Sequence, residues 1–166
     1  RRGRQLVAKT AGPLGPWLSA PQECWEDADG FSFVSPFVPG TTLRELLVRR
    51  GRFPAAIVVE IGRQLLAALS AAHARGIVHG DVRPSHVRLT DSGRLVLVQT
   101  GVRAVLTPQI HLHAGLPLES YDCVAPETIG VGLAPTVQSD LYAAGCVLWQ
   151  LLAGRPPFPV AEPLAK

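Results

Sequence analysis

The sequence predicts an α+β fold in which a reduced, strand-rich piece, residues 1–38, precedes a mainly helical piece, residues 39–166. Apolar residues recur at helical spacing over residues 54–75 and again after residue 139, which predicts two long helices with one apolar face each. Residues 24–38 instead combine aromatic and β-branched residues around a turn signal, a pattern typical of paired strands.

The composition indicates a globular domain. Of its 166 residues, 47% are hydrophobic and 17% charged, which is enough apolar surface for a core. The net charge is +3, but aromatic residues do not alternate with the arginines, so we expect no nucleic-acid partner. No apolar run reaches the roughly 20 residues that span a bilayer, so we expect no membrane segment here. Three widely separated cysteines favour a reducing compartment, and we expect a cytoplasmic protein.

The first elements are short. Residues 5–10 (QLVAKT) predict a strand that ends near Lys9. Residues 11–22 contain three prolines and two glycines, which exclude a regular helix. Two strands, over residues 24–29 and 31–38, are expected to pair around a turn at residues 28–30.

Two helices follow. Thr42 and Glu45, three residues apart, predict the capping box of a short helix. Pro54 begins the long helix, which we expect to run through Arg75 and to carry His73 on its surface.

A polar loop, GIVHGDVRPSHVRL over residues 76–89, joins this helix to an apolar strand at residues 95–98. Taken alone, Asp81 would be a turn residue that accepts hydrogen bonds from backbone N–H groups, and His79 a hydrogen-bonded core histidine. Two further motifs lie downstream, Ala-Pro-Glu at residues 125–127 and Ser-Asp-Leu-Tyr at residues 139–142, the latter opening the second apolar helix.

In their order and spacing, these motifs resemble the catalytic loop, the A-P-E motif and the S-D-x-Y-x-x-G helix start of a protein kinase, from about Phe31 to Phe158. The resemblance implies a kinase-like fold in which Asp140 accepts hydrogen bonds from the loop backbone. His-Gly-Asp followed by a proline also occurs in small-molecule phosphotransferases of the aminoglycoside and choline kinase type. The downstream motifs favour the protein kinases over that alternative.

The resemblance places Asp81 where the catalytic base of a kinase lies, but several residues around it differ. Gly80 stands in place of the arginine, and Arg83 in place of the lysine that would contact the transferred phosphate. His86 replaces the asparagine that holds magnesium, and Gln99 replaces the metal-binding aspartate of D-F-G. Because Mg²⁺ prefers charged or hard oxygen ligands, an imidazole and a neutral amide are poor substitutes, and we expect no metal site.

The expected nucleotide site is also altered. Lys9 resembles the V-A-I-K lysine, yet no glycine-rich loop precedes it. No acidic residue lies between Lys9 and Glu23, so the helix whose glutamate pairs with that lysine is expected to be missing. The resemblance places Val38 at the hinge, where its N–H would face an adenine edge, although the residues equally suit an ordinary edge strand that ends at a Pro-Gly turn. Arg88 falls on the floor of the adenine pocket, where we expect it either to be buried without a partner or to fill the pocket.

We therefore expect a catalytically inactive kinase homologue, a pseudokinase, with neither ATP nor magnesium as cofactor. It would act as a scaffold or regulatory module on other proteins or on other domains of a longer parent chain. The alternative is a divergent, active Ser/Thr kinase that uses Asp81 as base and holds ATP and magnesium with Lys9, Arg83 and an unusual metal arrangement. A small-molecule phosphotransferase is the third possibility. We also expect Glu127 to lack its family partner and some apolar surface to be left open.

Overall fold

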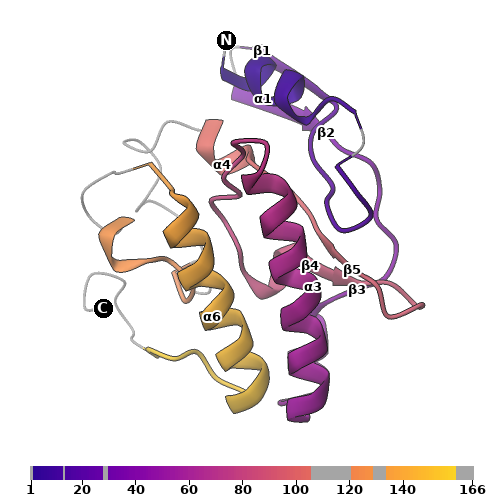
Figure 1. Cartoon of the computed structure of the whole chain (residues 1–166), viewed down its shortest axis with the longest axis vertical. Helices are drawn as coiled ribbons and strands as arrows, with labels where there is room; N and C mark the ends of the chain where they lie inside the picture. The colour runs from indigo at the N-terminus through magenta and orange to yellow at the C-terminus, as the bar shows by residue number, and fades with distance from the viewer. Residues whose placement is uncertain (1, 13, 28–29, 106–120, 129–133, 160–166) are drawn as a thin grey trace.

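The computed structural model describes residues 2–12, 14–27, 30–105, 121–128 and 134–159 of the chain. Two long helices, α3 (Ala55–His73) and α6 (Val137–Ala153), lie side by side (Figure 1). A small three-stranded sheet packs beside α3, and a separate β-hairpin with one helix lies at the N-terminal end of the molecule. The expected α+β fold is confirmed, whereas the proposed division at residue 38 stays a prediction.

The prediction of a strand over residues 5–10 is wrong, because these residues belong to helix α1 (Arg2–Thr10). Gly3, Leu6 and Thr10 are buried at spacings of three and four residues, while Lys9 is exposed, as the 3.6-residue period of a helix requires. Helix α1 lies before the segment in which we expected no helix, and its sequence contains no acidic residue.

The predicted strand pair is confirmed with slightly different ends, as β1 (Glu23–Asp27) and β2 (Gly30–Val34) in antiparallel register. Residues 28 and 29 of the predicted turn lie outside the described residues. Helix α1 packs on this hairpin so closely that a Cβ atom at Gly3 would overlap the Cys24 sulfur. Glycine at position 3 is therefore required for the contact.

The three-stranded sheet has the order β3 (Thr41–Thr42), β4 (Val87–Leu89), β5 (Leu95–Leu97). The proline-rich segment is not helical, as expected, and lies along the free side of β5. There the Leu97 N–H donates to the Trp17 carbonyl at 2.8 Å, and the Ser19 N–H donates to the Leu97 carbonyl at 2.9 Å. This segment therefore extends the sheet by one short parallel contact.

Helix α2 (Leu43–Arg50) begins with the predicted capping box: the Glu45 N–H donates to the Thr42 hydroxyl, and the Thr42 N–H donates to the Glu45 carboxylate at 2.8 Å. Each contact satisfies a backbone N–H that the first turn of a helix leaves without a partner. Gly51 ends the helix with a positive φ of 77°.

The core lies between α3, α6 and β5, and its central side chains are fully buried: Leu65, Leu69, Leu97, Val147 and Leu151. Among the described helices, α3 alone has the length and the mean hydropathy, 1.5, of a membrane span, and its apolar face packs against α6. On the opposite face of α6, Leu141, Trp149 and Leu152 are about half exposed.

Candidate active site

The loop between α3 and β4 is held in place by Asp140 of α6, as the sequence predicts. Its buried carboxylate accepts the backbone N–H groups of His79 and Gly80, both at 2.8 Å. The same carboxylate lies 2.8 Å from Nε2 of His73, whose side chain is mostly buried. The expectation that His73 lies on the helix surface is therefore wrong, because this histidine faces α6 rather than solvent.

His79 is a core histidine, as expected. Its Nε2–H donates to the Val98 carbonyl at 2.9 Å, and its Nδ1 accepts the Asp81 N–H at 3.1 Å. Since Nδ1 is an acceptor, the ring is neutral with its proton on Nε2. Burial lowers the pKa of His79, in agreement with this neutral state. The imidazole thus orients the Asp81 backbone.

Cationic and imidazole groups surround the Asp81 carboxylate, which is 18% exposed. One oxygen, Oδ1, lies 3.3 Å from Nη1 of Arg103 and 3.5 Å from Nε of Arg83. The other, Oδ2, lies 3.4 Å from Nδ1 of His86. Two guanidinium groups therefore face one carboxylate, and this Asp81 cluster, made of Asp81, Arg83, His86 and Arg103, has a net positive charge.

His86 lies in a short 3₁₀ helix, η1 (Pro84–His86), and both of its ring nitrogens already have protein partners. Nδ1 is 2.8 Å from the Asp81 carbonyl; because a carbonyl only accepts, Nδ1 carries the proton. Nε2 then accepts the Arg83 guanidinium at 3.1 Å. Burial lowers the pKa of His86, so the ring stays neutral near pH 7. No ring nitrogen is left for a metal ion.

Gln99 does not join this cluster. Its side chain is exposed, and within the described part of the chain it makes no hydrogen bond. Its backbone has a positive φ of 61°, unusual for a residue other than glycine, asparagine or aspartate and costing about 1–2 kcal/mol. The Gln99 carbonyl accepts the Val102 N–H at 3.2 Å and so leads into a short helix, α4 (Val102–Val105).

Arg103 of α4 was not predicted as a site residue. Gly80, at φ 79°, lacks a side chain, and a Cβ atom there would lie 3.7 Å from the Arg103 Cβ. Arg103 thus lies beside position 80, where the family carries an arginine. It brings a guanidinium to the Asp81 cluster, although it lies 22 residues beyond Asp81 in the sequence. No local sequence signal could identify this contact, because it depends on where α4 packs.

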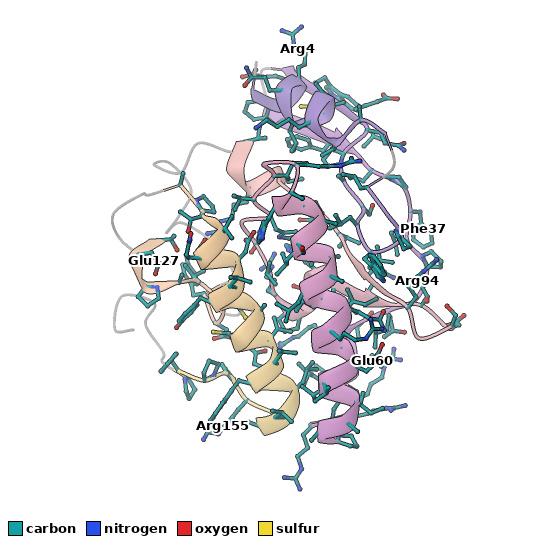
Figure 2. The ribbon with its side chains drawn as sticks, viewed as in Figure 1. Arg4, Phe37, Glu60, Arg94, Glu127 and Arg155 are labelled. Carbon is teal, nitrogen blue, oxygen red and sulfur yellow. The ribbon has the colours of Figure 1, made fainter. Side chains whose placement is uncertain are left out.

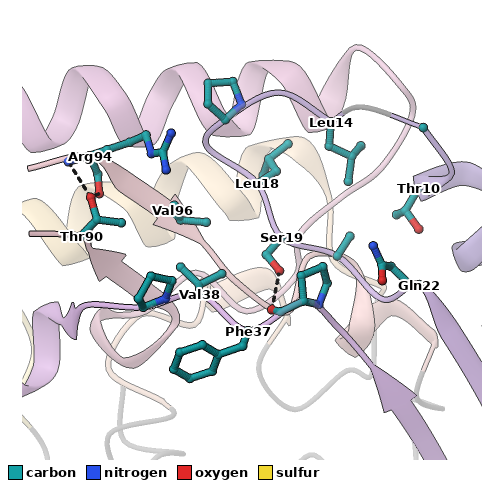
Figure 3. A pocket seen from close by; sticks show the side chains of 15 residues that line it. Thr10, Leu14, Leu18, Ser19, Gln22, Phe37, Val38, Thr90, Arg94 and Val96 are labelled. Carbon is teal, nitrogen blue, oxygen red and sulfur yellow. Dashed lines mark hydrogen bonds between the residues drawn. The ribbon is translucent and has the colours of Figure 1, made fainter. Parts of the chain in front are cut away.

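Two residues predicted to hold the nucleotide, Lys9 and Val38, form no hydrogen bond or ion pair with the Asp81 carboxylate. Lys9 is exposed on α1, so the strand on which its proposed role depended does not form. Val38 lines a cavity of about 310 Å³, shown in Figure 3, whose lining includes no member of the Asp81 cluster.

Arg88, on β4, matches neither of its two expected arrangements in full. One guanidinium nitrogen, Nη2, donates to the Gly40 carbonyl, whereas Nε is buried without a partner. The side chain does not line the cavity beside Val38. The guanidinium is therefore directed to the chain segment just after the predicted hinge.

The residues present do not fit a magnesium ion. Within the described residues, no group of three or more His, Cys, Asp and Glu side chains converges as metal ligands. The Asp81 carboxylate is the one anionic group in its cluster, and two guanidinium groups already face it. A divalent cation would have to displace or approach both positive charges, which electrostatics opposes.

A family model described as "Protein kinase domain" matches residues 16–165, and the chain belongs to the protein kinase family. The resemblance predicted from the sequence is thereby confirmed.

Similar proteins agree with this assignment. The chain is 38% identical to the serine/threonine-protein kinase PknD of Mycobacterium tuberculosis over 160 residues, 95% of this chain and 24% of PknD. It is 33% identical to PrkC of Bacillus subtilis over 158 residues, 95% of this chain and 24% of PrkC. The chain thus spans about a quarter of the length of these curated relatives.

The fold is also that of a solved kinase structure, Rad53 residues 1–466 in complex with AMP-PNP. The TM-score is 0.74 with 23% sequence identity, covering 97% of this chain and 40% of Rad53. At this identity the likeness concerns the fold alone.

Proposed function

We propose that this chain is a pseudokinase that acts as a scaffold or regulatory module by binding other proteins or other parts of a longer chain. The main support is His86. It stands at the position of the metal-binding asparagine, yet its two ring nitrogens are bonded to the Asp81 carbonyl and the Arg83 guanidinium. The loop is therefore closed by contacts within the protein at the point where an active kinase holds an ion.

The environment of Asp81 supports the same proposal. A catalytic base must face the proton that it accepts within hydrogen-bond distance. The Asp81 carboxylate already faces Arg83 and Arg103, so a substrate hydroxyl would have to displace a guanidinium group to reach it. Asp81 in this arrangement holds the loop and α4 together.

The framework of the loop is kept without any contribution from a metal ion. Asp140 accepts two backbone N–H groups, and His79 bonds both β5 and the Asp81 backbone. These bonds preserve the shape of the kinase lobe. A retained shape with altered chemical groups is expected of a domain that works by contact.

A divergent, active Ser/Thr kinase is the second candidate, because Asp81 is intact, Arg83 keeps the positive charge of the lysine it replaces, and the relatives named above are serine/threonine kinases. In that case Asp81 would be the base, and ATP and magnesium would be required. For either function we propose a cytoplasmic location, which is supported by Cys24, Cys123 and Cys146, none of which forms a disulfide.

Thermal unfolding with and without Mg-ATP separates the two candidates. A ligand at about 100 times its Kd stabilises a protein by about 2.7 kcal/mol, which raises the melting temperature by several degrees. We expect no rise for the natural chain. The double variant His86→Asn with Gln99→Asp restores the family's oxygen ligands. It tests whether those two positions are responsible for the expected absence of Mg-ATP binding. A rise in the natural chain would contradict this expectation, and phosphate transfer to a protein that Asp81→Asn abolishes would establish the active kinase instead.

A further inference from the structure

We propose that the cavity beside residues 36–39 is a docking site for an extended peptide of a partner protein, one with apolar residues and an acidic side chain. The inference deepens the proposed function and rests on it, because a module that acts by contact needs a surface for its partner. The cavity is separate from the Asp81 cluster, and no site residue predicted from the sequence lines it except Val38.

The cavity is an open hollow lined by both apolar and polar residues. Its volume of about 310 Å³ is at the lower end of the range of about 300–1,000 Å³ found for binding pockets. Leu14 and Leu18 line one side, residues 36–39 the other, and Val96 of β5 lies between them (Figure 3). Pro16, Pro36 and Pro39 restrict the backbone of these walls, so little conformational entropy is lost when a peptide binds.

Phe37 provides an apolar contact that the protein itself does not use. Its side chain is 86% exposed at the cavity, although aromatic rings of this size are usually buried. In Figure 3 the ring lies beside Val38 at the edge of the site. Exposed aromatic residues next to a pocket are typical anchors of a protein interface, because burying them removes a large apolar area from water.

Arg94 determines the charge of the ligand. Among the described residues that line the cavity it alone is charged. Its backbone is fixed by Thr90, whose N–H donates to the Arg94 carbonyl at 2.9 Å and whose hydroxyl accepts the Arg94 N–H at 3.2 Å. Its guanidinium forms no ion pair with any described residue, so it can bind a carboxylate, whereas a basic peptide would be repelled.

The shape of the site favours an extended chain. In Figure 3, Arg94 and Thr90 lie at one end of the cavity, Thr10 and Gln22 at the other, and apolar side chains between them. An extended peptide can place an acidic residue at Arg94 and apolar residues along the centre. A membrane surface is less suited to the site, since anionic lipids are recognised by clusters of basic residues and this cavity has one.

The test begins by panning a phage library of short random peptides against the complete chain. The enriched peptides are expected to combine an acidic residue with apolar residues. In fluorescence polarisation, Phe37→Ser should weaken their binding about fivefold or more. Arg94→Gln should weaken binding about threefold, but should not affect peptides whose acidic residue is changed to glutamine.

Two matched controls report on non-specific effects. Val59→Ser changes an apolar residue that is 71% exposed on α3, and Arg155→Gln changes an arginine near the end of α6, away from Arg94 in Figure 2. Both should bind the peptides as the natural chain does. The proposal is overturned if no peptide is enriched, if Phe37→Ser and Arg94→Gln bind like the controls, or if only phosphatidylserine vesicles bind. The assay does not measure phosphate transfer. The docking proposal can therefore fail while the pseudokinase proposal holds, and the docking proposal can hold while the pseudokinase proposal fails.

Discussion

Asp81 illustrates at the scale of single residues how neighbours change the role of a side chain. Arg83 and His86 approach it from its own loop, and Arg103 approaches it from α4. The carboxylate is thus the counter-ion that allows two guanidinium groups to lie close together. The role of a base in phosphate transfer would instead require one of its oxygens to face a substrate.

Replacing Asp81 by asparagine should therefore lower the free energy of unfolding by about 1–3 kcal/mol, because two partly buried guanidinium groups lose their compensating charge. Urea denaturation at neutral pH measures the change. Asp91→Asn, in the exposed turn after β4, is the matched control and should change stability by less than about 0.5 kcal/mol. Equal effects of the two substitutions would contradict the structural role of Asp81.

At the scale of elements, the loop between α3 and β4 depends on two histidines that are buried in their neutral form. Burial lowers the pKa values of both His79 and His86. In the unfolded chain a histidine has a pKa of about 6.5, so below that pH the unfolded state binds more protons than the folded state. The stability that the neutral rings contribute is complete above about pH 6.5 and is lost as the pH falls below it.

The free energy of unfolding should accordingly decrease between about pH 6.5 and pH 5, by at most about 1.4 kcal/mol per pH unit for each histidine. His86→Asn should reduce this slope, because an asparagine amide can donate to the Asp81 carbonyl and accept from Arg83 without titrating. Arg63 and Gln64 lower the pKa of Glu60 to about 2. Glu60 therefore titrates below about pH 5 in both the folded and the unfolded state and does not contribute to this slope. The prediction would be contradicted if the free energy of unfolding did not change between about pH 6.5 and about pH 5. Equal slopes for the natural chain and His86→Asn would also contradict it.

At the scale of the whole molecule, stability comes from the contact of α3 with α6 and β5. Within α3, Leu65 is fully buried whereas its neighbour Leu66 is about half exposed, since successive residues of a helix point in different directions. Gly62 faces Leu148 of α6, and a Cβ atom there would lie 3.2 Å from Leu148 Cδ1. The helices are therefore packed closely along this side.

Leu65→Ala should lower the free energy of unfolding by about 2–5 kcal/mol, because it leaves a cavity in the centre of this contact. Leu66→Ala removes the same atoms from a half-exposed position and should cost less than about 1 kcal/mol. Urea unfolding of the two variants provides the measurement. Similar losses would mean that α3 does not pack by the face that contains Leu65.

Secondary-structure elements that depend on residues close in sequence could be predicted well. The capping box of Thr42 and Glu45, the apolar period of α3 and the strand pair β1–β2 each arise from residues close in sequence. Helix α1 was missed because QLVAKT is too short to distinguish a strand from a helix; its burial pattern arises from packing on the β-hairpin. His73 was misplaced for a related reason, as its partner Asp140 is 67 residues away.

The family and the order of the main helices could be read from the sequence, and the resemblance predicts that His86 and Gln99 replace two magnesium ligands. Three features became visible only in the folded chain: both nitrogens of His86 are occupied, Arg103 faces Asp81, and Phe37 and Arg94 border one cavity. The reason is physical. Motifs and helical periods arise from neighbours along the chain, whereas charge pairs and cavities arise where distant segments pack together.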